Sequence, residues 1–282
     1  MQLHLILPAE TPDMPFTELR ELAVLAERLG YRGAWLPDHL LPPGRYEPGS
    51  YGGVFDPLVA LAAIAGATSE IRLGTSVLVL PLRSPFVVAK QAATIERISA
   101  GRFTLGVGIG WDAAEFSTVG AEFTGRAARA DEAIELIRQL LGGDGAFTGR
   151  HCGSPGGVFE PVPTGPVPIA VGGSGKPALR RAARLGDEWQ PIRPCPERFA
   201  ADLAWLRANS ARPVRASVRT SWTGGAAELD QVLAEVSGYE RAGAAATAIW
   251  FGSDAGVPER MAEFIPAANE VLRNSAGRWP RT

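Results

Sequence analysis

The sequence has few cysteines, no excess charge of one sign and no long apolar run. Its 2 cysteines, Cys152 and Cys195, fit neither a disulfide framework nor a zinc site, so we expect no metal. Lysine and arginine (28) nearly balance aspartate and glutamate (30), which argues against a nucleic-acid partner. No stretch is long enough to cross a bilayer, and "MQLHLILPAE" has neither a cationic region nor a cleavage site. We therefore expect a cytoplasmic protein with no membrane partner and with a small-molecule substrate.

What the chain does contain is a repeated pattern of an amphipathic helix, a glycine, a short turn and a short apolar strand. The segments "LRELAVLAERLGYRGAWLPD", "ALRRAARLGDEWQP" and "GYERAGAAATAIWFG" all follow it. In the first, Leu22, Leu25, Ala26 and Leu29 share one helix face, and Gly30 is placed to end the helix in the left-handed conformation. The strands are continuous apolar runs, which is typical of parallel strands covered on both sides.

About eight such units fit the chain, which is the number that closes a TIM barrel. We predict an α/β protein with a single (β/α)8 TIM-barrel domain over residues 1–282; an open doubly wound sheet is the structural alternative. The predicted strands are 3–7, 33–36, 71–79, 103–109, 168–171, 187–190, 214–221 and 246–251. The predicted helices are 16–29, 56–69, 85–99, 127–141, 176–185, 196–208, 227–242 and 257–273.

Residues 142–167 interrupt this pattern before the fifth strand. They contain eight glycines and four prolines, a composition that excludes a helix. We expect an insertion in a position to cover the barrel mouth.

Asp38 and His39 follow the second strand directly. In a TIM barrel the active site lies at the carboxyl ends of the strands, so both residues should be at the mouth. An imidazole there can take or give a proton, and Asp38 would fix the loop or contact a ligand. The alternative is a loop histidine bonded only to backbone. His4 lies within the first strand and should be a core residue, whereas His151 lies in the insertion and should be exposed.

The fifth strand runs into "VGGSGKPALRRAARLG", which has the features of an anion-binding turn. Gly172 and Gly173 would let backbone approach a ligand, and Ser174 could cap the following helix, with Pro177 in its first turn. The helix amides and Lys176 would favour a phosphate. The alternative is a tight turn without a ligand.

The fourth strand, "FTLGVGIGW", has glycines at 106, 108 and 110. Glycine weakens strands, so we expect something flat or bulky to need this space; the spacing is not that of a dinucleotide fingerprint. Large aromatic residues near strand ends either wall an apolar pocket or belong to the core: Trp111, Trp222 and Phe251.

Together these residues resemble the luciferase-like monooxygenase superfamily, in particular its branch of oxidoreductases that use the deazaflavin coenzyme F420. The matching segments are "LGYRGAWLPDHL", "IRLGTSVLVLPLRSPFVVAKQAATIERISAGRFTLGVGIGW", "GRAARADEAIELIRQLL" and "VPIAVGGSGKPALRRAARLGDEWQP", in order over residues 29–191.

The resemblance implies roles for several residues. His39 would lie beside the reactive ring as the acid or base, and the segment Thr75, Ser76 and Val77 would carry a non-proline cis peptide that supports the ring. It also implies that the turn at 172–174 binds the cofactor phosphate, and that similar proteins are homodimers. The remaining expected cofactor-binding residues are Asp38, Gly110 and Trp111.

The match departs from the family pattern at one position. Some relatives have a glutamate directly after "GVG" that is used in proton transfer, where this chain has Ile109. Glu10 and Glu115 are possible substitutes. The substrate would be selected by residues 40–55, which include Tyr46 and Tyr51, and by the insertion.

The resemblance therefore implies an F420-dependent oxidoreductase that transfers a hydride between the deazaflavin and a small organic substrate. Because a deazaflavin reacts poorly with oxygen, reduction or dehydrogenation is expected rather than oxygen insertion. The alternatives are an FMN-dependent monooxygenase of the same fold and a barrel that binds a cofactor without catalysis.

Overall fold

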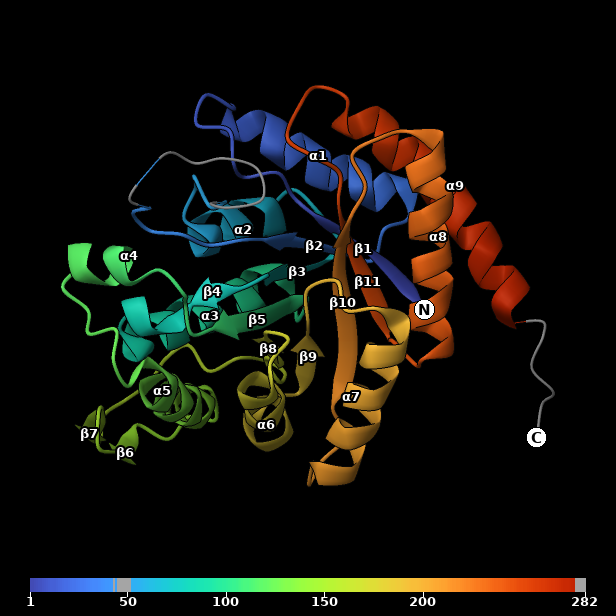
Figure 1. Ribbon diagram of the computed structural model, residues 1–282. Coiled ribbons are helices and arrows are strands. Elements are labelled where there is room, and N and C mark those ends of the chain that lie inside the picture. Colours follow the sequence, from blue (N-terminus) through green and yellow to red (C-terminus); the bar gives the residue numbers. More distant parts are fainter. Residues whose placement is uncertain (43, 45–51, 277–282) are drawn as a thin grey trace.

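The computed structural model describes residues 1–42, 44 and 52–276 and forms a closed barrel of parallel strands surrounded by helices (Figure 1). The sheet order is β3-β2-β1-β11-β10-β9-β8-β5-β4, and an additional β3–β5 pairing closes the ring. The predicted (β/α)8 barrel is confirmed, because an open sheet would leave β3 and β5 unpaired. The barrel strands are β1 (Gln2–Ile6), β2 (Gly33–Leu36), β3 (Arg72–Thr75), β4 (Leu78–Val79), β5 (Phe103–Gly108), β8 (Ile169–Gly172), β9 (Glu188–Gln190), β10 (Arg215–Ser221) and β11 (Ala246–Trp250).

Apart from a short helix at Ala113–Thr118 that was not predicted, the helices lie close to the ranges predicted from periodicity. Gly30 ends the first helix at φ 94°, as expected, and the second begins after Asp56, whose side chain accepts hydrogen bonds from Leu58 N and Val59 N. The helices are α1 (Phe16–Leu29), α2 (Pro57–Ala65), α3 (Pro85–Ser99), α4 (Ala113–Thr118), α5 (Arg126–Leu141), α6 (Lys176–Leu185), α7 (Pro196–Asn209), α8 (Ala226–Arg241) and α9 (Val257–Ala276), with a 3-10 turn at Leu80–Leu82. In the described part of the chain no helix combines the length and apolarity needed to span a membrane.

The third strand differs from its prediction. The apolar run 71–79 is not one strand but two, β3 and β4, interrupted between Ser76 and Val77 by a non-proline cis peptide bond. The position of this bond agrees with the expectation for Thr75, Ser76 and Val77.

The glycines of the fourth strand make room for this interruption, not for a ligand. A Cβ atom on Gly106 would lie 1.8 Å from the carbonyl oxygen of Thr75, and one on Gly108 would lie 2.6 Å from Val77 Cγ2. On the neighbouring strand, a Cβ on Gly172 would lie 2.8 Å from Val77 Cγ1. A bulky group does lie beside these glycines, as expected. It is not a ligand, however, because the space is filled by the backbone of Thr75 and the side chain of Val77.

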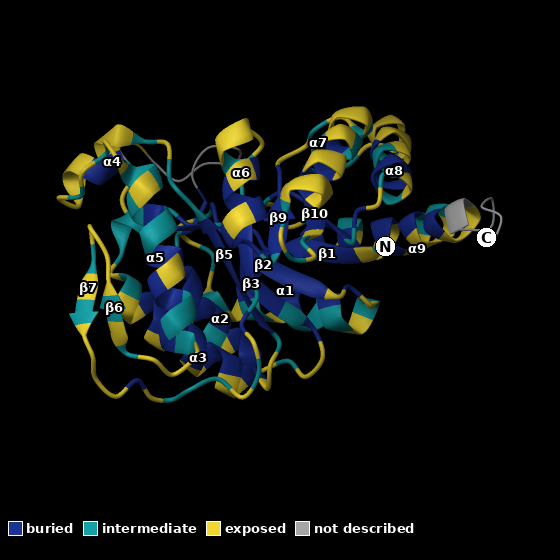
Figure 2. Ribbon diagram, turned by 90° about the horizontal axis from the view of Figure 1, so that it is seen from below, coloured by how far each residue is buried: buried dark blue, intermediate teal, exposed yellow. Residues whose placement is uncertain are grey.

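The insertion lies away from the barrel mouth. Residues 146–155 form a two-stranded antiparallel hairpin, β6 (Ala146–Thr148) and β7 (Gly153–Pro155), at the outer edge beside α5 (Figures 1 and 2). Glu96 of α3 accepts hydrogen bonds from the Thr164 and Gly165 amides and holds its end. The prediction that residues 142–167 cover the mouth is wrong, because these side contacts anchor the segment to α3.

Two apolar cores stabilise the barrel. The larger lies between the strands and the helices, and Figure 2 shows the buried strands at the centre with exposed outer helix faces. The smaller lies inside the barrel and contains Ile6, Trp35 and Ala248. His4 joins it by accepting a hydrogen bond of 2.9 Å from Trp35 Nε1, and burial lowers the pKa of His4 to about 3. His4 is thus the core residue that the sequence predicted, and His151 is exposed, as predicted.

Candidate active site

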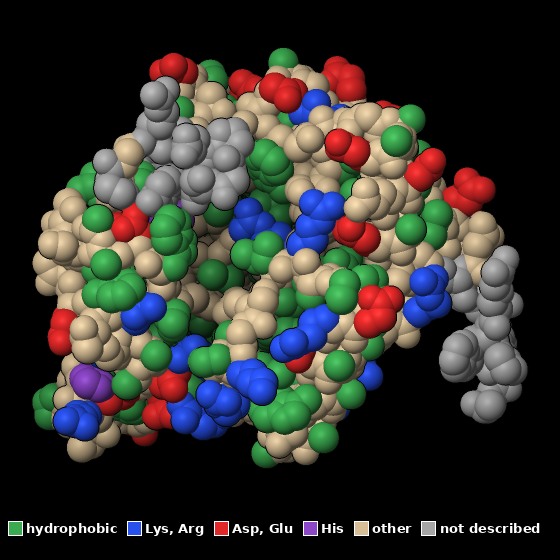
Figure 3. Space-filling model, in the orientation of Figure 1, with side chains coloured by type: hydrophobic (Ala, Val, Ile, Leu, Met, Phe, Trp, Pro, Cys, Tyr) green, Lys and Arg blue, Asp and Glu red, His purple; other side chains and the backbone are tan. Residues whose placement is uncertain are grey.

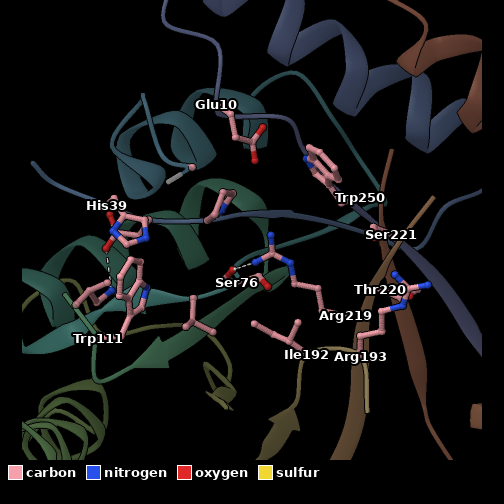
Figure 4. A pocket seen from close by; sticks show the side chains of 15 residues that line it. Glu10, His39, Ser76, Trp111, Ile192, Arg193, Arg219, Thr220, Ser221 and Trp250 are labelled. Atoms are coloured by element: carbon pink, nitrogen blue, oxygen red, sulfur yellow. Dashed lines mark hydrogen bonds between the residues drawn. The ribbon is translucent and has the colours of Figure 1, made fainter. Parts of the chain in front are cut away.

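A cavity of about 520 Å³ opens at the carboxyl ends of the barrel strands. Figure 3 shows the hollow near the centre of this face, and Figure 4 shows the side chains around it. The cavity is lined by residues that follow β1, β2, β3 and β9 and by residues within β10 and β11. They include Glu10, His39, Ser76, Arg219 and Trp250. Its volume is within the range of roughly 300–1,000 Å³ usual for small-molecule sites.

His39 is paired with a glutamate from a short helix that the sequence did not predict. Its Nδ1 lies 3.0 Å from Glu115 Oε2, and Glu115 Oε1 accepts hydrogen bonds from the Leu40 amide at 2.6 Å and the Leu41 amide at 3.0 Å. Burial alone would raise the pKa of Glu115, but the hydrogen bonds from His39 and the two amides outweigh it and hold the pKa below its usual value. A carboxylate accepts only, so Nδ1 carries the proton toward Glu115.

Replacing Glu115 by glutamine should destabilise the protein in a pH-dependent way. Because the folded-state pKa of Glu115 is depressed, its stabilisation is present above the unfolded pKa and is lost as the pH falls through the folded value. At pH 7 we expect Glu115→Gln to lower the free energy of unfolding by about 2 kcal/mol, measured by urea denaturation. This difference from the wild type should shrink below about pH 4.5.

The control for this prediction is Glu21→Gln, which changes an exposed glutamate on α1. This variant should have the same free energy of unfolding as the wild type at pH 7 and at pH 3. A Glu115→Gln deficit that is equally large at pH 7 and pH 3 would contradict the assignment of an ionised Glu115.

Asp38 lines the cavity, but its oxygens are engaged by the protein. Asp38 Oδ2 accepts from the Val79 amide at 2.8 Å and from Arg83 Nη1 at 2.6 Å, and Oδ1 accepts from Arg83 Nη2 at 2.8 Å. Of the two roles expected for Asp38, these contacts favour fixing the loop. The bidentate pair joins the end of β2 to the segment after β4, and so holds the neighbouring His39 in place.

The Ser76–Val77 segment forms part of the cavity wall. Ser76 O accepts a hydrogen bond of 2.9 Å from Arg219 Nη1, and Ser76 Oγ donates one of 2.6 Å to Gln190 Oε1. Thr75 lies behind this wall and is fully buried, with Oγ1 donating to Gly106 O at 2.6 Å. Ser76 and Val77 are therefore placed to contact a ligand, and Thr75 supports them.

The diglycine turn lies near the same face but does not line this cavity. Gly173 N donates to Gln190 O at 3.2 Å, and Ser174 Oγ accepts from the Ile192 amide at 3.1 Å. Gly175, not Ser174, is the N-cap of α6, because the Ser174 hydroxyl is turned toward Ile192 instead of the helix. The expected capping role of Ser174 is wrong, whereas phosphate binding at 172–174 stays a prediction.

The aromatic residues divide between the cavity and the core. Trp111 lines the cavity, is 60 % exposed, and has its ring centroid 5.9 Å from that of His39. Trp222 and Phe251 belong to the core. Gly110 has φ 71°, and its missing side chain leaves room for Phe116 and Val79, so it shapes the wall beside Trp111.

Trp250 and Arg219 line the cavity but were missed by the sequence reasoning. Both lie at inward positions of strands, where Ala248 precedes Trp250 and Ser217 precedes Arg219 by two residues. Strand alternation was the signal that could have identified them. Glu10, one of the proposed substitutes for the missing family glutamate, also lines the cavity, and burial raises its pKa. Figure 4 shows Glu10 near Trp250, across from Ser76.

The cavity fits a flat heteroaromatic ring. Val77, Val79 and Ile192 give it apolar surfaces, while His39 and Arg219 supply polar groups at different sides (Figure 4). An apolar pocket with a few placed polar groups is the usual form of a cofactor or substrate site. Among the described residues no cluster of histidine, cysteine or carboxylate side chains could hold a metal ion.

A closed parallel barrel with a histidine and glutamate pair beside a cavity at its carboxyl rim has the architecture of TIM-barrel enzymes. The chain belongs to the luciferase-like monooxygenase family, which it matches over residues 1–225.

Curated relatives align with the chain over part of their length. An uncharacterised Mycobacterium tuberculosis protein is 36% identical in a 187-residue alignment that covers 62% of this chain and 65% of the relative. The F420-dependent glucose-6-phosphate dehydrogenase of Nocardia farcinica is 38% identical in a 179-residue alignment that covers 60% of this chain and 51% of that enzyme. The chain thus spans between about half and two thirds of these relatives.

Solved structures with the same fold cover nearly the whole chain. A monooxygenase from Streptomyces bottropensis superposes with a TM-score of 0.77 at 20% identity, covering 97% of this chain and 99% of that one. An F420-dependent secondary alcohol dehydrogenase, solved with an F420–acetone adduct, gives 0.76 at 16% identity, covering 95% and 98%. At these identities the likeness establishes the fold alone.

Proposed function

We propose that this chain is a coenzyme F420-dependent oxidoreductase that transfers a hydride between the deazaflavin and a small organic substrate. The observation that carries the proposal is the His39–Glu115 pair beside the same cavity as the Ser76–Val77 segment. The names of the F420-dependent relatives support the choice of cofactor. Cytoplasmic location and homodimerisation stay predictions from the sequence.

The residues that would hold the ring are Val77 and Ser76 on one wall, Trp111 beside His39, and Arg219. When bound, F420 supplies the two-electron hydride chemistry, and the protein supplies orientation and electrostatics. The apolar surface of Val77 and Val79 excludes water from one part of the cavity. Asp38, held by Arg83, keeps the following residue His39 at the rim.

His39 would move the proton that accompanies the hydride. When a substrate carbon loses its hydride, the proton of the adjacent hydroxyl or amine passes to His39 Nε2; in the reverse direction Nε2 returns it. Glu115 stabilises the imidazolium that forms, because its carboxylate already accepts the Nδ1 proton. Glu10, with its raised pKa, is a second group that could hold a proton in the cavity.

Side-by-side fluorescence titrations with F420, FMN and FAD test this proposal. We expect F420 to quench the intrinsic tryptophan fluorescence at micromolar concentration or below, since Trp111 and Trp250 line the cavity. The flavins should bind more weakly. Hydride transfer, followed by the change in F420 absorbance with a panel of alcohols, ketones and enones, should then occur without oxygen consumption. Failure of F420 to bind would overturn the proposal.

The second candidate is an FMN-dependent monooxygenase, which the family match and the monooxygenase structure with the same fold support. Oxygen consumption with reduced FMN and a substrate would establish it. A protein that binds F420 but exchanges no hydride with any of these substrates would instead be a non-catalytic cofactor-binding barrel.

A further inference from the structure

A chain of buried polar side chains crosses the barrel interior beneath the cavity. It begins at Ser76, where Oγ lies 2.6 Å from Gln190 Oε1. Gln190 Nε2 then lies 3.3 Å from Ser217 Oγ, and Ser217 Oγ lies 2.7 Å from Glu188 Oε1. All four residues are between 0% and 6% exposed. The chain links the segment after β3 to β9 and β10, and only Ser76 reaches the cavity.

The direction of every hydrogen bond in this chain follows from the carboxylate at its end. A carboxylate only accepts, so the Ser217 hydroxyl must donate its single proton to Glu188. Ser217 Oγ can then only accept from Gln190, which turns the amide nitrogen of Gln190 toward Ser217 and its oxygen toward Ser76. The Ser76 hydroxyl must therefore donate to Gln190.

The consequence reaches the cavity wall. With its proton committed to Gln190, Ser76 Oγ can only accept in any further hydrogen bond. The backbone carbonyl of Ser76 is already engaged by Arg219. The hydroxyl and the carbonyl of Ser76 are thus held in fixed directions by the protein before a ligand arrives.

We propose that Glu188 is a remote positioning residue for the cofactor, which acts through Ser217 and Gln190 to fix Ser76 as a hydrogen-bond acceptor. The complementary ligand group is a ring N–H donor, such as the imide N–H that deazaflavins and flavins share. This inference rests on the proposed function, because it concerns the wall against which the ring would bind.

Replacing Glu188 by glutamine can reverse the direction of the hydrogen bonds between Glu188 and Ser76 without changing the size of the side chain. An amide at position 188 can donate to Ser217, whose proton is then released toward Gln190. A flipped Gln190 amide would donate to Ser76, and the Ser76 hydroxyl would become a donor. The variant keeps side-chain size and hydrogen-bonding capacity, so the barrel should still fold.

The experiment is a fluorescence titration with F420 of the wild type, Glu188→Gln, Ser76→Ala and the double variant. We expect Glu188→Gln to raise the Kd about three- to tenfold, the effect of losing one hydrogen bond. In the Ser76→Ala background Glu188→Gln should have no further effect, because the residue through which it acts is gone. A purely structural role would give the same change in both backgrounds.

The matched control is Thr247→Val, which removes a buried hydroxyl of β11. This hydroxyl contacts the Met1 sulfur and is not part of the hydrogen-bonded series from Ser76 to Glu188. It should leave the Kd unchanged. The positioning role would be overturned by an unchanged Kd in Glu188→Gln, or by an equal loss of F420 affinity in both backgrounds. In either case, binding of F420 by the wild type would leave the proposed function intact. If only FMN binds the wild type, the same comparison applies with FMN; binding of neither overturns both proposals.

Discussion

Replacing His39 by alanine should lower the kcat for hydride transfer with F420 by about 10²–10⁴-fold. The expected loss is large because His39 lines the cavity and is held by Glu115, and no other histidine among the described residues lines the cavity. The Kd for F420 should change by less than about threefold, because removing an acid or base affects the chemical step more than binding. Turnover is measured by F420 absorbance and binding by fluorescence quenching.

His151→Ala is the control, since His151 is exposed on the insertion and away from the cavity. It should keep wild-type kcat and Kd. A His39→Ala variant that retains turnover, or one that loses binding in proportion to turnover, would remove His39 from the proton-transfer role.

The second large effect is expected from Gly106→Ala. A Cβ at this position would lie 1.8 Å from the carbonyl oxygen of Thr75, a backbone atom that cannot move without displacing β3. We expect the free energy of unfolding to fall by about 3 kcal/mol, at the upper end of overpacking costs. The displaced strand leads into the Ser76 segment, so F420 binding should weaken as well.

Gly66→Ala is the matched glycine control. Gly66 has φ −73°, and a Cβ there would make an ordinary contact of 3.6 Å with Ala63 O. The variant should be neutral or stabilised by less than about 1 kcal/mol. Equal urea midpoints for Gly106→Ala and the wild type would show that β3 and β5 do not pack as described.

The barrel could be predicted from the sequence because helical periodicity, the glycines that end helices and the apolar runs of the strands all indicate the same alternation of helix and strand. Periodicity alone could not predict the third strand, because its interruption depends on glycines at 106, 108 and 172 that make room from neighbouring strands. The position of the insertion depended on tertiary contacts with Glu96, to which local composition gives no guide.

The candidate site was predictable where residues directly follow a strand. His39 was found in this way, and Trp111 by its place after β5, whereas Ser76 and Val77 came from the family resemblance. Arg219 was missed because β10 was interpreted as a continuous apolar strand although its inward positions are polar. The pairing of His39 with Glu115 required a long-range contact that spacing alone does not reveal.

Substrate selection stays a prediction. Tyr46 and Tyr51, which were expected to help select the substrate, lie outside the described residues. The other expected selector, the insertion, contributes no residue to the cavity. Residues in the described part that could contact a substrate instead include Arg193, Ile192 and Thr220.

The most direct test of this account is a crystal structure of the protein with F420 bound. We predict that the deazaflavin ring lies in the cavity at the carboxyl rim of the barrel, in contact with Val77 and Ser76 and within hydrogen-bonding reach of His39. A ring bound elsewhere on the molecule, or in the cavity but beyond reach of His39, would contradict it.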